Sequence, residues 1–161
     1  MKEKIKLTKG INLINKKYKS KEFYHFFEEP SNVIVIPKFK KYYILVKQKR
    51  VPINKKNFEF PMGWIDKGEN SLNASKRELL EETGYKSLIS PIKFLEFYPD
   101  PGRGNRKCFC YYTDRLRKVG REEKNIEIFF KTKYEIQKMI NIKEFNNSSH
   151  IAAFSHYISK F

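Results

Sequence analysis

The chain has 161 residues, with 34 Lys and Arg against 18 Asp and Glu and a formal net charge of +16. Such a length suits one domain with a sizeable core, so we expect residues 1–161 to form a single domain. No apolar stretch is long enough to cross a bilayer, and the Lys-rich start lacks the apolar segment of a signal peptide. These features argue against a membrane or secreted protein and predict a cytoplasmic one.

The positive charge has two interpretations. Lys and Arg near phosphates release counterions and drive sequence-independent binding, which predicts weak, non-specific RNA binding. The basic residues are mostly Lys scattered among many Asn and Ile, however, a composition that is also typical of an AT-biased coding sequence. Under either interpretation, the surface would attract a polyanionic substrate.

The first 29 residues are basic and aromatic, and no linker separates them from the rest of the chain. Short alternations at 4–7 and 23–27 predict strands. We expect His25, a lone histidine among aromatic residues, to fill a core or an edge rather than act as a base. Pro30 interrupts the pattern.

Two apolar runs at 33–36 and 42–46 flank a polar turn and predict a hairpin at the centre of a β-sheet. The second run continues into Gln48, Lys49 and Arg50. Arg50 is either a surface charge or, as a fork of guanidinium donors at a strand end, a clamp for a diphosphate.

A helix predicted at 71–83 would separate apolar from acidic residues. Its packing side would hold Leu72, Leu79, Leu80 and Thr83, and its acidic side Glu78, Glu81 and Glu82. Ser71 is the expected N-cap and Gly84 the expected terminator.

The acidic side is either a solvated helix face or a cation site. Glu78 and Glu82 stand one turn apart, where like charges repel, so a cation is expected between them. A carbonyl from the turn at Met62 and Gly63 could join the carboxylates. Oxygen ligands of this kind suit Mg²⁺ or Mn²⁺.

The segment from Gly63 to Tyr85 resembles the Nudix box, Gly-x5-Glu-x7-Arg-Glu-hydrophobic-x-Glu-Glu-x-Gly-hydrophobic, at every fixed position. Tyr85 stands where the family usually has an aliphatic residue. The resemblance implies divalent-metal-dependent hydrolysis of a nucleoside diphosphate linked to another group. It also implies an α/β fold, an α/β/α sandwich around a mixed β-sheet, with the box helix on one face and a closing helix on the other.

The same resemblance assigns roles to the residues of the box. It implies Glu78 and Glu82 as the main metal ligands, Glu81 as an additional ligand and the Met62 carbonyl as a backbone ligand. The remaining pair, Glu69 and Arg77, would form a structural ion pair between loop and helix.

Residues on either side of the box narrow the resemblance to the ADP-ribose pyrophosphatase branch. They are Gln48-Lys49-Arg50, Glu59-Phe60-Pro61-Met62-Gly63, and Pro101, sixteen residues beyond the box. The resemblance implies that Arg50, Glu59 and Pro101 contact the substrate, with ADP-ribose hydrolysed to AMP and ribose 5-phosphate. Alternatively, Pro101 and Gly102 simply stiffen a turn. The branch commonly has an acidic residue after this Pro-Gly, whereas residues 103–106 are basic here.

Cys108 and Cys110 lie two residues apart in a strand predicted at 107–112, and both are far from any histidine in sequence. We therefore expect buried thiols rather than a zinc site. A long polar connection at 113–125 then precedes a strand at 126–130. In the ADP-ribose branch, a loop at this place carries a glutamate proposed as general base. Glu122 matches it, Glu123 lies one step on, and Glu81 is the candidate if neither acts.

A helix is predicted at 134–140, followed by a closing helix capped by Ser148 or Ser149. The closing helix would bury Ile151, Phe154 and Ile158 and expose His150 and His156. In the branch that this chain resembles, extra strands at the start often serve dimerisation, so residues 1–29 make a homodimer one expectation.

Two other functions remain open on the sequence alone. The same site would suit a pyrophosphohydrolase acting on RNA 5′ ends or on dinucleotides. A non-catalytic nucleotide- or RNA-binding Nudix-like module is the alternative of another class, although the complete set of box glutamates argues against it.

Overall fold

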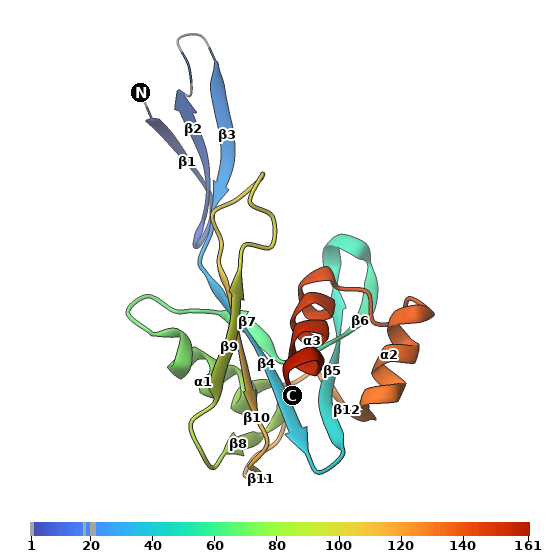
Figure 1. Cartoon of the computed structure of the whole chain (residues 1–161). Coiled ribbons are helices and arrows are strands. Elements are labelled where there is room, and N and C mark those ends of the chain that lie inside the picture. The colour runs from blue at the N-terminus through green and yellow to red at the C-terminus, as the bar shows by residue number, and fades with distance from the viewer. Residues whose placement is uncertain (1, 18, 20–21) are drawn as a thin grey trace.

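The computed structural model describes residues 2–17, 19 and 22–161, which form strands and helices in the order shown in Figure 1. The strands are β1 (Lys2–Thr8), β2 (Ile11–Lys17), β3 (Phe23–Glu28), β4 (Asn32–Phe39), β5 (Tyr42–Arg50), β6 (Lys55–Glu59), β7 (Met62–Trp64), β8 (Tyr85–Ser87), β9 (Ile92–Phe97), β10 (Cys108–Thr113), β11 (Leu116–Lys118) and β12 (Glu127–Thr132). The helices are α1 (Ser71–Thr83), α2 (Lys133–Asn141) and α3 (Ser148–Lys160), with a 3₁₀ turn at Val51–Ile53.

The central sheet has seven strands in the order β12-β5-β4-β10-β9, with β6 paired to β5 and β7 paired to β4. β10 runs parallel to β4, and the other neighbours are antiparallel. The sheet is therefore mixed, which confirms the predicted α/β fold class.

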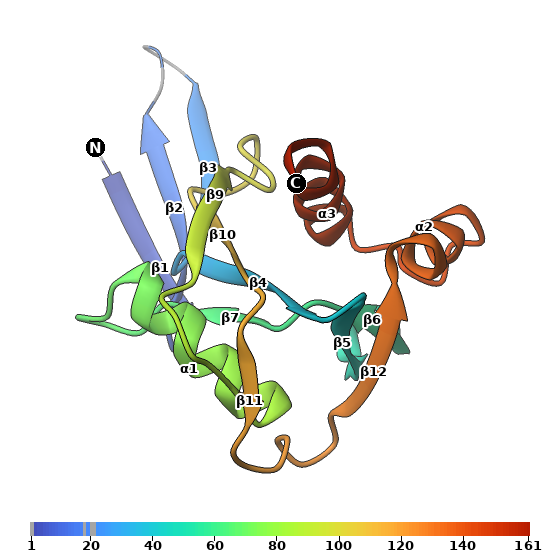
Figure 2. The same ribbon diagram turned by 60° about the horizontal axis from the view of Figure 1, so that its bottom comes forward.

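β4 is a central strand of the sheet that lies between α1 and α3 (Figure 2). Val33 and Val35 pack towards Ala74 and Leu79 of α1, whereas Ile34 and Ile36 belong to the cluster that contains Phe154 and Tyr157 of α3. Figure 2 shows α1 and α3 on opposite sides of the sheet. A strand covered on both faces is typically a continuous apolar run, which is the pattern of residues 33–36.

The predicted hairpin of β4 and β5 forms only at its turn. The two strands pair at Lys38 with Tyr43 and at Phe39 with Tyr42, and then they separate. Beyond that point β4 pairs with β7 and β10, while β5 pairs with β6 and β12. The predicted hairpin at the centre of the sheet is therefore confirmed, although its strand pairing is short because each apolar run also finds partners from elsewhere in the chain.

The helix ends differ slightly from the prediction. α1 has its predicted bounds and ends at Gly84 (φ 66°), but its N-cap is Asn70, whose side chain accepts a hydrogen bond from the Asn73 amide. The Ser71 hydroxyl instead bonds the Tyr111 hydroxyl at 2.7 Å. The α3 N-cap is likewise an asparagine, Asn147, one residue before the predicted serines.

The predicted packing face of α3 is confirmed in part. Phe154 is buried and Ile151 and Ile158 pack partly buried against the same core, but the other buried residues of the helix are His150, Ala153 and Tyr157. The prediction that His150 is exposed was wrong, because its imidazole is fully buried against the rings of Phe60 and Phe145. His156 stacks on Phe94 and is half-buried rather than exposed.

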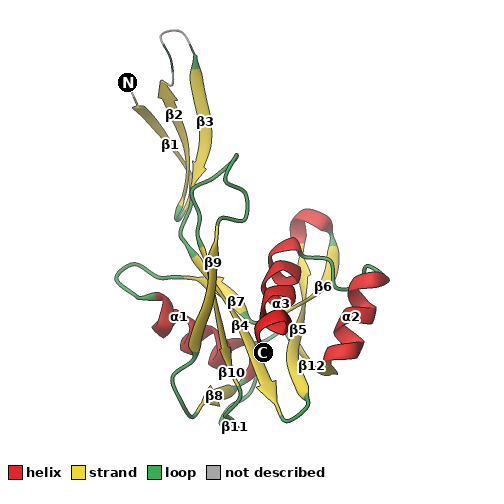
Figure 3. Cartoon of the chain, viewed as in Figure 1, coloured by secondary structure: helices red, strands yellow, loops and turns green. Residues whose placement is uncertain are grey.

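β1, β2 and β3 form a separate antiparallel sheet that extends away from the main body (Figure 3). Its link to the body is the end of β3, where the Phe27 amide donates to the Arg103 carbonyl at 2.8 Å. His25 lies exposed on this sheet and bonds Asn15, which places it at an edge rather than in a core. Elsewhere, Cys108 and Cys110 are buried free thiols, as predicted. None of the helices in the described ranges is long and apolar enough to cross a membrane.

Candidate active site

The site is built where β7 crosses the middle of α1. A β-carbon on Gly63 would stand 2.0 Å from the Glu78 carboxylate, closer than side-chain atoms approach one another. Glycine is therefore required here, because it lets the strand lie directly against the helix. This close approach presses the Met62–Gly63 backbone onto the acidic side of α1.

Glu78 and Glu82 are buried in this contact, with 8% and 6% of their surfaces exposed. Burial raises the pKa of Glu82 to about 8, although the Met62 amide donates a hydrogen bond to it at 3.1 Å. Burial also raises the pKa of Glu78, against the opposing effect of Arg77. Two carboxylates removed from water in one place favour the binding of a cation that would restore their ionised form.

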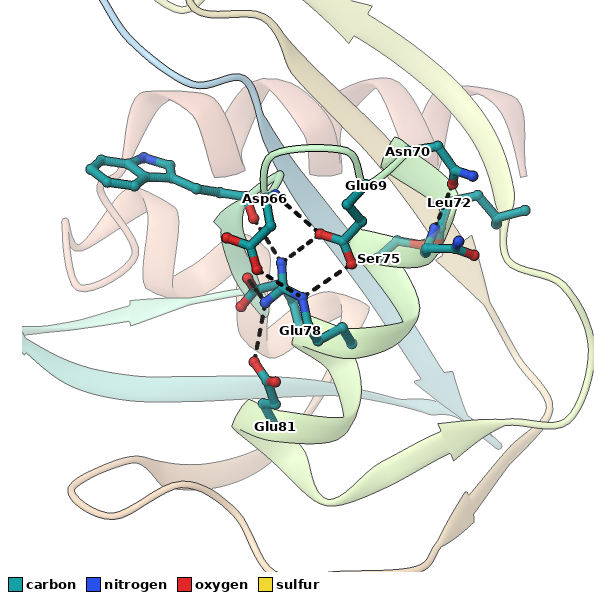
Figure 4. Close-up of polar contacts among 10 residues, drawn as sticks. Asp66, Glu69, Asn70, Leu72, Ser75, Glu78 and Glu81 are labelled. Carbon is teal, nitrogen blue, oxygen red and sulfur yellow. Dashed lines mark hydrogen bonds and ion pairs between the residues drawn. The ribbon is translucent and has the colours of Figure 1, made fainter. Parts of the chain in front are cut away.

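Arg77 joins the loop before α1 to the helix itself. Its guanidinium donates to Glu69 at 2.9 and 3.1 Å and to the Trp64 carbonyl at 2.8 Å. It also contacts Glu78 at 2.6 Å and Glu81 at 3.1 Å, and Figure 4 shows Glu78 and Glu81 on α1 and Glu69 in the loop before it. The hydrogen bonds from Arg77 lower the pKa of Glu69.

The predicted metal ligands are only partly assembled. Glu78 and Glu82 lie together against the Met62–Gly63 backbone, but the Glu81 carboxylate is exposed and held by Arg77. Among the described residues, no three His, Cys, Asp or Glu side chains converge as a ready metal centre. The chemistry of the buried pair nevertheless fits a hard divalent ion, because it offers desolvated carboxylate oxygens beside the Met62–Gly63 backbone.

Gln48 is a functional candidate that the sequence analysis did not assign. Its side-chain amide donates to Glu82 at 3.3 Å from the neighbouring β5 strand. Gln48 and Arg50 are two residues apart on one strand and so lie on the same face. This spacing was the signal in the sequence that could have identified Gln48 together with Arg50.

Arg50 and Glu59 form an ion pair across β5 and β6. The Arg50 Nε donates to both Glu59 oxygens, at 3.1 and 3.2 Å, and its Nη2 contacts the same carboxylate. Burial is the largest single influence on the Glu59 pKa and raises it, but the hydrogen bonds and charge of Arg50, together with His150 and Asn57, lower the pKa overall. Glu59 is 0% exposed, so it holds Arg50 in place and has no surface to offer a substrate.

Two cavities adjoin the acidic pair. One, of about 550 Å³, is lined by Arg50, Met62, Gly63 and Trp64. The other, of about 750 Å³, is lined by Gln48 and Glu123. Pro101 lies in neither of them; it lines a separate hollow of about 500 Å³ with Tyr24 and Phe26 of β3.

The predicted long loop is shortened by a strand. β11 pairs with β8, which leaves residues 119–126 as the connection to β12. The Glu122 carboxylate lies 3.0 Å from the Lys118 ammonium, and its pKa is lowered by its own backbone amide and by Lys118. The Glu123 amide donates to the Glu81 carbonyl at 2.9 Å, which anchors the loop to α1.

Comparison with known proteins finds relatives that match parts of the chain. The mouse (Mus musculus) ADP-sugar pyrophosphatase is 46% identical over 65 residues, which are 38% of this chain and 28% of that protein. The ADP-ribose pyrophosphatase of Bacillus subtilis (strain 168) is 29% identical over 106 residues, 63% of this chain and 57% of that protein. The chain thus matches less than two thirds of the length of either relative.

A solved structure described as an ADP compounds hydrolase superposes on the chain with a TM-score of 0.82. The match covers 99% of this chain and 90% of that one at 16% sequence identity, so it shows a shared fold. The proteins of this family generally use divalent metal ions, which agrees with the buried carboxylates beside Gly63. Residues 17–147 match the NUDIX domain, and the chain therefore belongs to the NUDIX domain family.

Proposed function

We propose that the protein is a pyrophosphohydrolase that depends on Mg²⁺ or Mn²⁺ and cleaves a nucleoside diphosphate linked to a sugar, with ADP-ribose as the first substrate to test. The observation that carries this proposal is the buried pair Glu78 and Glu82 against Gly63. The relatives named as ADP-ribose and ADP-sugar pyrophosphatases support the choice of substrate.

A bound divalent ion would neutralise the diphosphate and lower the pKa of the attacking water. Glu78 and Glu82 would hold it, with the Met62 carbonyl as a backbone ligand. Arg77 fixes the loop against α1, and Gln48 orients the Glu82 carboxylate. Attack of water on phosphorus breaks the bridging P–O bond and releases AMP and ribose 5-phosphate.

We assign the general base to the loop after β11 and favour Glu123 over Glu122. Glu123 lines the cavity that also contains Gln48, the hydrogen-bond partner of Glu82. Glu122 is instead paired with Lys118, which helps to lower the Glu122 pKa and so reduces its basicity. Arg50, held by Glu59, lies at the mouth of the other cavity, where its remaining donor can face a phosphate.

The deciding experiment is a turnover screen of ADP-ribose, other ADP-sugars and dinucleotides, with Mg²⁺, with Mn²⁺ and with EDTA. We expect ADP-ribose to be hydrolysed only with a divalent ion. Glu82→Gln should abolish turnover while circular dichroism shows a folded protein, because α1 keeps its shape but the ion loses a charged ligand. Near-normal turnover of this variant in saturating Mg²⁺ would overturn the assignment of the site.

We further propose that the three-stranded sheet of β1, β2 and β3 pairs with a second copy of the chain. All the residues of β1 are exposed, and Ile5, Leu7 and Phe23 present large apolar side chains to solvent. Exposed apolar groups on a sheet that stands away from the body favour a partner surface. Sedimentation of the full chain beside a variant lacking residues 1–29 measures this directly.

A further inference from the structure

The cavity of about 550 Å³ beside Gly63 has polar side chains in its wall that binding of a diphosphate alone does not explain. Its walls include Asn32 at the start of β4, Arg106 just before β10, and Asn147 and Ser149 at the start of α3. Its size falls within the usual range for small-molecule sites. Because Gly63 also touches Glu78, a ligand in this cavity would lie directly beside the reacting centre.

Two polar groups in these walls lack partners. In the part of the chain that the structure describes, the buried side-chain polar atoms without a hydrogen bond are Asn32 Oδ1, Arg106 Nε and His150 Nε2. Asn32 and Arg106 both line this one cavity; Asn32 is only 5% exposed, whereas the Arg106 side chain is 35% exposed with its Nε atom buried. Buried polar groups are normally satisfied, so two orphans in one cavity wall indicate a missing ligand.

The two unpaired atoms need different hydrogen-bond partners. The Asn32 oxygen is an acceptor and needs a hydroxyl or amino donor, whereas the Arg106 Nε is a cationic donor and needs an anion. Arg106 already has Glu29 at 3.0 Å from its Nη1, which fixes the side chain and leaves the Nε edge of the guanidinium unsatisfied. A guanidinium edge binds phosphate in a two-point contact.

The start of α3 adds a second attraction for anions. Asn147 caps this helix of 13 residues, and both Asn147 and Ser149 line the cavity. The first amides of a helix favour negative charge. By contrast, the cavity beside Gln48 places Lys49, Lys56 and Lys124 among the acids Glu123 and Glu127, and Lys56 is paired with Glu127.

We propose that the cavity between β4, β7, β10 and the start of α3 binds a sugar bearing a phosphate monoester, in addition to the diphosphate that is cleaved. Arg106 and the start of α3 contact the phosphate, and Asn32 accepts from a sugar hydroxyl. This inference rests on the proposed function for the reaction, but the binding itself does not depend on turnover. It names phosphorylated nucleoside diphosphate sugars as the preferred substrate class.

The first test is calorimetry of the full chain with three nucleotides: AMP, adenosine 2′,5′-bisphosphate and adenosine 3′,5′-bisphosphate. We expect one bisphosphate to bind at least tenfold more tightly than AMP. In the second arm, the affinity for ribose 1,5-bisphosphate is compared with that for ribose 5-phosphate. This comparison tests for a phosphate on the other sugar of the substrate. If no bisphosphate binds with more than twofold higher affinity than its monophosphate, the proposal is overturned.

Variants then locate the contact. Arg106→Gln should remove the bisphosphate preference, whereas Arg103→Gln should keep it, because Arg103 is an exposed arginine of the same loop that does not line the cavity. Equal losses in both variants would mean that bulk charge is responsible and would overturn the site. Glu29→Gln should strengthen bisphosphate binding because it removes the negative charge beside Arg106, and an unchanged preference in this variant would count against the proposal.

Folding and turnover are controlled separately. If Arg106→Gln does not fold, Arg106→Lys keeps the charge but loses the two-point contact and should lower the preference several-fold. A protein that binds the bisphosphate yet hydrolyses no nucleoside diphosphate would refute the proposed function alone. A protein that hydrolyses ADP-ribose and its 2′-phosphate with equal kcat/KM, and binds both bisphosphates like AMP, would refute this inference alone.

Discussion

Glu82 shows how burial of one residue sets the properties of the site. Its pKa is raised to about 8, so the folded protein without a divalent ion keeps a proton there that the unfolded chain releases near its ordinary value of 4.5. A group with a raised pKa stabilises the fold at low pH, and this contribution is lost as the pH rises through the folded pKa. The free energy of unfolding therefore falls as the pH rises towards alkaline values.

We predict that in EDTA the free energy of unfolding falls by on the order of 2 kcal/mol between about pH 6.5 and 8. This window avoids His150, whose pKa is lowered to about 4 by burial and which stabilises the fold as the pH rises from about 4 to 6.5. Urea unfolding at both pH values measures the difference. Saturating Mg²⁺ or Glu82→Gln should abolish the fall, and a slope of the same size in the variant would assign it to another group.

Glu122 and Glu123 are neighbours in sequence with different surroundings. We predict that Glu123→Gln lowers kcat by roughly a hundredfold to ten-thousandfold, the range for loss of a general base, and leaves Mg²⁺ affinity nearly unchanged. Glu122→Gln should lower kcat by less than about tenfold, since it removes an exposed ion pair with Lys118. Initial rates and metal titrations of both variants provide the measurement.

The reverse order of these two effects would move the base back to Glu122, the residue that the sequence indicates. If neither substitution lowers kcat by about tenfold, the loop does not supply the base. Glu81, whose carboxylate lies 3.1 Å from Arg77, then becomes the candidate.

At the scale of elements, Arg77 couples the loop after β7 to α1. Arg77→Ala would leave the Trp64 carbonyl without its donor and Glu69 without its partner, since the guanidinium bonds both. We predict a loss of stability of about 1–3 kcal/mol together with a loss of turnover. Thermal and urea unfolding measure the first effect, and an unchanged melting temperature would contradict it.

Arg77→Lys is the matched control for this prediction. It keeps the charge but replaces the planar guanidinium fork with a flexible ammonium group. It should recover part of the stability and less of the activity. Full recovery of both would mean that charge alone, rather than the forked geometry around Glu69, connects the loop to the helix.

At the scale of the whole molecule, the net charge of +16 predicts non-specific attraction to nucleic acid. We expect random-sequence RNA to bind weakly, with an affinity that falls by roughly tenfold or more between about 50 and 200 mM salt. A titration of log Kd against log salt concentration gives the slope. Tight binding that persists at physiological salt would instead favour a function on RNA 5′ ends.

The sequence by itself determined the features that depend on local spacing. The helical period places Glu78 and Glu82 one turn apart, and Gly84 ends the helix where a left-handed residue is needed. Apolar runs and turn residues likewise predicted the strands β1, β3, β4, β5, β10 and β12 and the three helices, whereas β2, β6, β7, β8, β9 and β11 were not predicted. Local patterns were a poorer guide to helix orientation, since α3 buries His150 instead of exposing it.

Only the tertiary structure decided which distant residues meet. Contact between Gly63 and the Glu78 carboxylate, the Gln48 hydrogen bond to Glu82 and the covering of His150 depend on packing between separate elements. Asn32 and Arg106 share a cavity because β10 runs parallel to β4, with Cys108 opposite Asn32. Parallel pairing joins segments with a long crossover between them, and no local period in the sequence encodes that register.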